Sequence, residues 1–126
     1  MAFTNTLTMT LAGDGKAVGA TIAAYTGSEQ GGISIQIPAG ATDQEVDIVF
    51  PVADLQFVAF KTDQDLTIKV NSTSTPAPAL ALNKTAGIFW GNNFLYDCPL
   101  TTNVTKFYIS NAGAVAANFE FRYLLT

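Results

Sequence analysis

The most constraining feature of this sequence is a two-residue alternation of apolar and polar side chains that recurs along most of the chain. Residues 118–125 read NFEFRYLL, with Phe119, Phe121, Tyr123 and Leu125 on one parity and the polar residues Asn118, Glu120 and Arg122 on the other. A period of two places successive side chains on opposite faces of a strand, so such a segment predicts a β-strand with one buried face. No segment has the 3.6-residue period of a helix convincingly.

The same alternation, with turn residues about every ten positions, predicts a series of short strands. We expect them at 3–11, 33–37, 46–52, 55–61, 66–70, 80–82, 87–90, 105–110 and 118–125. Residues 55–61, LQFVAFK, are apolar on both parities. Residues 18–25 are open between a strand and a short helix, because alanine favours helices whereas Gly19 and Thr21 do not. Gly31-Gly32 is expected to mark a break between two secondary-structure elements.

The pattern as a whole predicts one all-β domain over residues 1–126. We expect an antiparallel β-sandwich of about eight strands, jelly-roll-like in arrangement. A length of 126 residues suits one domain and leaves little room for two. Within it, residues 1–12 form either a strand of the same sheet or an N-terminal arm that engages a neighbouring molecule. The run FTNTLTMTL carries no charge, which suits pairing with a neighbour's sheet edge.

Composition excludes several function classes. The chain has no histidine, which removes Ser-His-Asp and Cys-His catalysis and histidine-ligated metals. The single cysteine, Cys98, cannot form an internal disulfide and has no basic neighbour to activate its thiol. Six basic residues and a net charge of -4 argue against nucleic acid and anionic membranes as partners. We therefore expect a non-enzyme without catalytic residues, metal or cofactor.

Two pairs of carboxylates are candidates for a metal site or a catalytic site. Asp63 and Asp65 could supply half of a calcium site, but no glycine and later glutamate complete a known loop, so a solvated turn is favoured. Glu45 and Asp47 lie about 7 Å apart on one strand face, a spacing that glycoside hydrolysis permits. A plain polar strand face is the favoured interpretation there too.

Aromatic residues gather in a segment rich in glycine and asparagine. Phe89, Trp90, Phe94 and Tyr96 surround Gly91, Asn92 and Asn93. Three interpretations stay open: core residues at the end of the sandwich, anchors of a protein interface, or a platform for stacking on a sugar. The interface candidates of the whole chain are Phe3, Leu7, Met9, Leu11, Trp90, Phe94 and Tyr96.

From Asp54 to the C-terminus, the chain resembles small virion proteins of tailed bacteriophages. The likeness lies in the segments DLQFVAFKTDQDLTIKVNSTSTPAPALAL, TKFYISNAG and ANFEFRYLL, and in the loop around Trp90-Gly91-Asn92. The members of this group resemble jelly-roll decoration or cement proteins. The resemblance implies a protein on the outer surface of the phage head that bridges major capsid subunits, and it implies no catalytic residues.

The leading hypothesis is thus a structural virion protein that is made in the bacterial host cytoplasm and stabilises a capsid. Its expected partners are the major capsid protein and further copies of itself, as a dimer or trimer. The alternative is a tail or host-attachment module that binds carbohydrate, which predicts Trp90 or Tyr96 exposed in a groove beside Asn92 and Asn93. A small glycosidase is a third hypothesis and would need two convergent carboxylates in a cleft.

Overall fold

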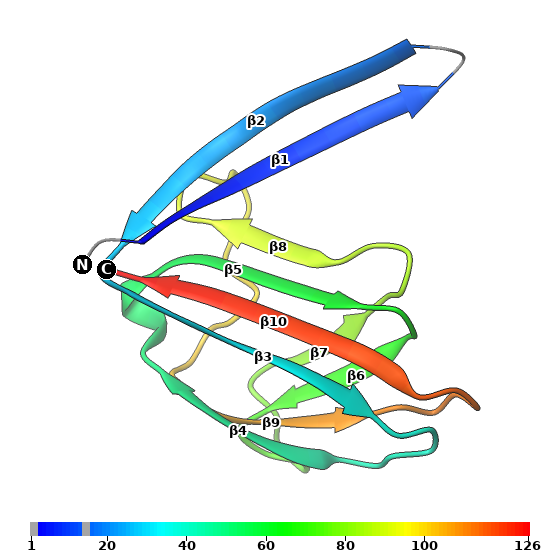
Figure 1. Ribbon diagram of the computed structural model, residues 1–126. Coiled ribbons are helices and arrows are strands. Elements are labelled where there is room, and N and C mark those ends of the chain that lie inside the picture. Colours follow the sequence, from blue (N-terminus) through cyan, green and yellow to red (C-terminus); the bar gives the residue numbers. More distant parts are fainter. Residues whose placement is uncertain (1–2, 14–15) are drawn as a thin grey trace.

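The computed structural model describes residues 3–13 and 16–126, and the side chains of residues 3–6 and 27–126. Two four-stranded antiparallel sheets pack as a sandwich, and a two-stranded ribbon rises from one corner (Figure 1). The strand orders are β3-β10-β5-β8 and β4-β9-β6-β7. The strands are β1 (Phe3–Gly13), β2 (Lys16–Gly27), β3 (Glu29–Ile37), β4 (Gln44–Phe50), β5 (Leu55–Thr62), β6 (Leu66–Val70), β7 (Ala79–Leu82), β8 (Ile88–Gly91), β9 (Val104–Ser110) and β10 (Ala117–Leu125).

The sandwich is a nested hairpin. Strand β6 pairs with β7, β5 with β8, β4 with β9 and β3 with β10, and successive pairs lie in alternate sheets. A long hairpin rolled up in this way is the jelly-roll arrangement of eight strands. The fold class expected from the alternating sequence is therefore confirmed.

The core lies between the inward faces of the two sheets. Its centre is aromatic: the ring of Phe121 lies 4.7 Å from that of Phe60 and meets Phe107 edge-on at 5.1 Å. Alternation carries these residues inward, since Asn118, Glu120 and Arg122 of the same strand are exposed. Burial of such large apolar side chains is the main favourable term in folding.

Three local expectations are resolved by strand pairing. Residues 16–27 form a strand, not a helix, because β2 pairs with β1 from Gly13↔Lys16 to Phe3↔Gly27. The expected break at Gly31 and Gly32 is absent, because strand β3 continues through both residues and pairs there with Tyr123 and Arg122 of β10. Residue Val52 was expected in a strand but lies in a short 3₁₀ helix, Val52–Asp54, which turns the chain from one sheet to the other.

Candidate functional site

A second apolar cluster lies outside the sandwich, on the outward face of the sheet β3-β10-β5-β8. Phe57 of β5 and Leu124 of β10 are cross-strand partners there and are 8% and 0% exposed. Phe3, Phe89 and Phe94 pack against this pair and are themselves partly buried. Since outward positions of such a sheet normally face water, this cluster exists because something covers it. The cover comes from Phe3 at the base of the β1–β2 ribbon and from Phe94, which follows β8.

The ribbon is fastened at a close backbone approach. The amide of Ser28 donates to the carbonyl of Leu125 at 2.9 Å. A Cβ at Gly27 would lie 2.1 Å from that same carbonyl oxygen and 2.9 Å from Leu124 Cγ. Only glycine permits backbones to approach this closely. The last residue of β2 is therefore the point at which the ribbon joins the sandwich.

Beyond its base the ribbon extends away from both sheets, and we call it the arm (Figure 1). At about 3.3 Å per residue its eleven-residue strand β1 spans roughly 35 Å. Lys16 is the only charged residue in the described residues of β1 and β2. Leu7, Met9 and Leu11 belong to β1, but their side chains fall outside the described part of the structure. An isolated two-stranded ribbon is marginally stable in water, so the distal arm is suited to packing on a partner.

Residues 92–97, which we call the aromatic loop, fold back on β8. Trp90 faces the core, and its Nε1–H donates to the carbonyl of Tyr96 at 3.0 Å. The hydroxyl of Tyr96 donates to the carbonyl of Phe89. The amide of Asn92 donates to the carbonyl of Gln56 at 3.0 Å, and their side chains are also hydrogen-bonded. These bonds hold the loop in one shape over the edge of the sheet.

Apolar surface remains exposed at the tip of this loop. Leu95 is 106% exposed and Tyr96 is 56% exposed, whereas Trp90 and Phe94 are partly buried. Exposed large apolar side chains next to one another are typical of contact surfaces. Trp90 packs against the core and its indole N–H is bonded to Tyr96, so this tryptophan is only partly exposed. Two hollows lined by described residues lie away from this loop, one near Ser110 and one near Arg122.

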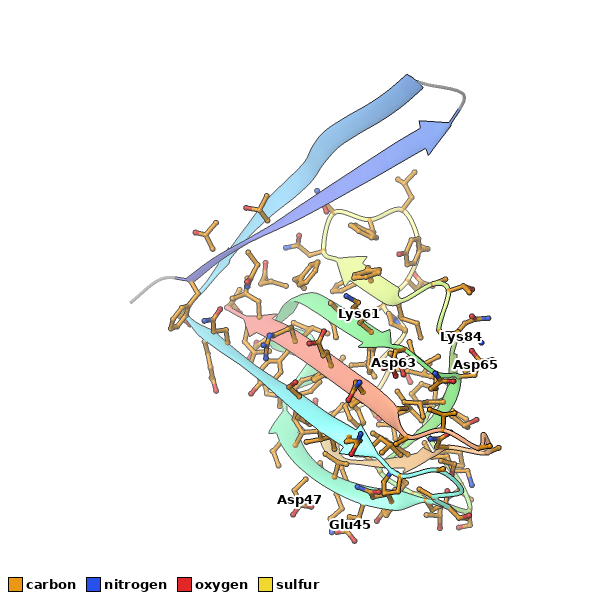
Figure 2. All side chains as sticks on the ribbon, turned by 45° about the vertical axis from the view of Figure 1, so that its right-hand side comes forward. Glu45, Asp47, Lys61, Asp63, Asp65 and Lys84 are labelled. Carbon is orange, nitrogen blue, oxygen red and sulfur yellow. The ribbon has the colours of Figure 1, made fainter. Side chains whose placement is uncertain are left out.

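The carboxylates of Asp63 and Asp65 fasten loops (Figure 2). Asp63 accepts both the backbone amide and the side-chain amide of Asn118, at 2.7 and 2.8 Å. These two bonds favour the ionised form and lower the pKa of Asp63 below its usual value. Asp65 accepts the backbone amide of Lys84 at 2.9 Å. Within the described residues, no cluster of three or more potential metal ligands of the His, Cys, Asp or Glu type occurs.

Glu45 and Asp47 project from the outward face of β4 and meet a lysine (Figure 2). Lys106 of β9 forms ion pairs with both carboxylates, the one with Asp47 at 3.8 Å. The hydrogen bond and charge of Glu45 raise the pKa of Lys106, and Asp47 adds to the effect. All three side chains are well exposed, so the arrangement matches an ordinary polar sheet face and not a catalytic cleft.

Cys98 is half-buried beside the core, and burial raises the pKa of its thiol. A thiol whose pKa is raised is a weaker nucleophile at neutral pH, because less of it is ionised. This agrees with the lack of a basic neighbour that would activate the thiol.

Sequence reasoning missed the outer cluster of Phe57 and Leu124 and the surroundings of Arg122. One signal was available for the cluster: residues 55–61 are apolar on both parities, and a strand apolar on both faces must be covered on both. Nothing in the sequence around Arg122 distinguishes it from other polar residues on the outward parity.

No protein-family model, curated protein or solved structure matches this chain. Among the described residues there is also no helix of the length and apolarity needed to span a membrane.

Proposed function

We propose that this chain is a structural protein of a bacteriophage virion that decorates the outer surface of the head and stabilises the shell by bridging major capsid subunits. The observation that carries the proposal is the arm: a long, nearly uncharged two-stranded ribbon that packs on its own sandwich at its base and then extends away from it (Figure 1). Such a ribbon has unpaired outer edges, which are suited to adding to the sheet of a neighbouring protein.

The rest of the molecule is consistent with a passive role. The carboxylate pairs are engaged in loop fastening and surface ion pairs, and the aromatic loop is closed by its own hydrogen bonds. The tip at Leu95 and Tyr96 offers exposed apolar surface, and the arm offers a long strand pair with one charged residue among its described positions. Many modest contacts of this kind, repeated over a shell, give strong attachment through avidity.

Self-association into a dimer or trimer is part of the proposal. Copies that each carry a charge of -4 repel one another, so they would meet through uncharged surfaces. The segment from Ile88 to Tyr96 has no charged residue, and β1 and β2 together have one, Lys16. Sedimentation velocity of the purified protein measures the oligomeric state directly.

The deciding experiment is electron cryo-microscopy of intact particles of the phage that encodes the protein. We expect density for the jelly roll on the outer surface of an icosahedral head, with the arm in contact with at least one capsid subunit. Location on the tail, or absence from the particle, would overturn the proposal. A glycan array with Tyr96→Ala as the control variant would then test the host-attachment alternative.

A further inference from the structure

Arg122 is the only arginine in the chain, and it occupies an unusual place. It projects from the outward face of β10, where it is exposed. It forms no ion pair with the described residues, although Glu120 lies two positions away on the same face. In contrast, Lys69 pairs with Asp43 and Lys106 pairs with Glu45. The single guanidinium of an acidic protein is thus left with its hydrogen-bond donors available.

Two glycines of the edge strand β3 make room for the side chains opposite them. Gly32 is the cross-strand partner of Arg122, and a Cβ there would lie 2.4 Å from Arg122 Nη1. Gly31 is the partner of Tyr123, and a Cβ there would lie 2.4 Å from the Tyr123 hydroxyl. The Arg122 side chain therefore lies over Gly32 of β3, in the space that a side chain there would occupy.

A hollow of about 390 Å³ opens at this point, between the base of the arm and the sheet. Its lining is polar: Asn5 from the arm, Gln30 from β3, and Arg122 and Tyr123 from β10, with Gly31 and Gly32 as the floor. Arg122 carries the only charge in that lining. The two amide side chains add further N–H donors, so the hollow is a positively charged, donor-rich pocket on a molecule of net charge -4.

We propose that this hollow is a carboxylate-binding site that receives an aspartate or glutamate side chain of a protein partner. The planar fork of a guanidinium matches the two oxygens of a carboxylate, and charge-assisted hydrogen bonds of this type are the strongest ordinary ones. A phosphate polymer is a poorer occupant, because the acidic chain as a whole repels it while a single carboxylate at one pocket is repelled far less.

The site also ties the arm to its ligand. Asn5 belongs to β1, whereas Arg122 and Gln30 belong to the sandwich, so a bound carboxylate would bridge the two. A partner side chain in this hollow would fix the direction of the arm at its base. The identification of that partner as a capsid subunit rests on the proposed function, but the chemistry of the site does not.

The test uses nuclear magnetic resonance of the intact ¹⁵N-labelled protein, in which the one arginine gives one side-chain Nε–H signal. The probes are a blocked tripeptide with a central glutamate, its glutamine counterpart and inorganic phosphate, at equal ionic strength. We expect saturable shifts of the Arg122, Asn5 and Gln30 side-chain signals with the glutamate peptide and none with the glutamine peptide. Arg122→Lys should weaken binding about tenfold, because the bidentate geometry is lost. Lys61→Gln, on the same sheet face, should leave binding unchanged.

Shifts that merely follow ionic strength, or tighter binding of phosphate than of the glutamate peptide, would overturn the site. Binding to purified shells separates this inference from the proposed function. If Arg122→Gln binds shells as the unchanged protein does, the carboxylate site is wrong and decoration stands. If the peptide shifts appear but the unchanged protein does not bind shells, the proposed partner is wrong and the site stands.

Discussion

At the scale of single residues, the close approach of two backbones at Gly27 leaves no room for a side chain. We predict that Gly27→Ala lowers the free energy of unfolding by about 1–3 kcal/mol, because its Cβ would meet the carbonyl oxygen of Leu125 at 2.1 Å and the backbones must separate. Urea unfolding followed by circular dichroism measures the change. Gly113→Ala is the matched control, since the nearest atom to its Cβ is a side-chain oxygen of Asn111 at 3.3 Å. An equal loss in both variants would contradict this account.

Asp63 gives a second residue-scale prediction, on pH. Its pKa is lowered in the folded protein by the two bonds from Asn118, so it stabilises the fold above the pKa of the unfolded chain. This contribution is lost as the pH falls through the lower folded pKa. We therefore expect Asp63→Ala to be destabilising at pH 7, with the deficit shrinking as the pH falls below about 3.8.

Urea unfolding at a series of pH values tests this. Asp97→Ala is the control, because Asp97 is exposed and forms no hydrogen bond or ion pair with the described residues. A deficit in Asp63→Ala that stays constant from pH 7 down to pH 3 would contradict the role of its charge.

At the scale of elements, the arm and the sandwich are joined by Phe3. We predict that Phe3→Ala loosens the arm while leaving the sandwich intact, because Phe3 packs on the outer cluster of Phe57 and Leu124 and is not among the residues of the core between the sheets. The partly buried ring should be worth roughly 1–2 kcal/mol, less than a fully buried phenylalanine. Hydrogen exchange should become faster in β1 and β2 and stay unchanged in β5 and β10. Faster exchange throughout all four strands would show that the arm is part of the core.

The elements also show what could be predicted from the sequence. The apolar pattern and the turn residues between strands located β3 to β10 within a few residues, because each of these strands has at least one face in the core. The pattern failed at Gly31-Gly32, where the side chains of Tyr123 and Arg122 on the partner strand replace the missing bulk. Such compensation is tertiary and leaves no local signal.

The outer cluster could be predicted only in part from the sequence. Phe57 lies in a segment apolar on both parities, which indicates cover on both faces but does not say what provides it. The identity of the cover depends on the path of the arm, and β1 and β2 carry no signal for the sheet face on which they sit. The hollow around Arg122 could not be predicted, since it brings together Asn5, Gln30 and Arg122 from three strands.

At the scale of the whole molecule, the nested pairing of β3 with β10 through β6 with β7 closes the jelly roll without the arm. We predict that residues 28–126 fold into a sandwich that unfolds in one cooperative transition, with reduced stability because Phe57 and Leu124 lose their cover. The proposed function predicts that the same fragment loses binding to phage shells, because it assigns the contact with the neighbour to the arm. Urea unfolding and co-sedimentation with purified shells measure the two properties separately.

A fragment that fails to fold, even with Phe57→Thr to remove the uncovered ring, would make the arm an integral part of the domain. A fragment that folds and still binds shells would place the contact on the sandwich and leave the arm without the role proposed here.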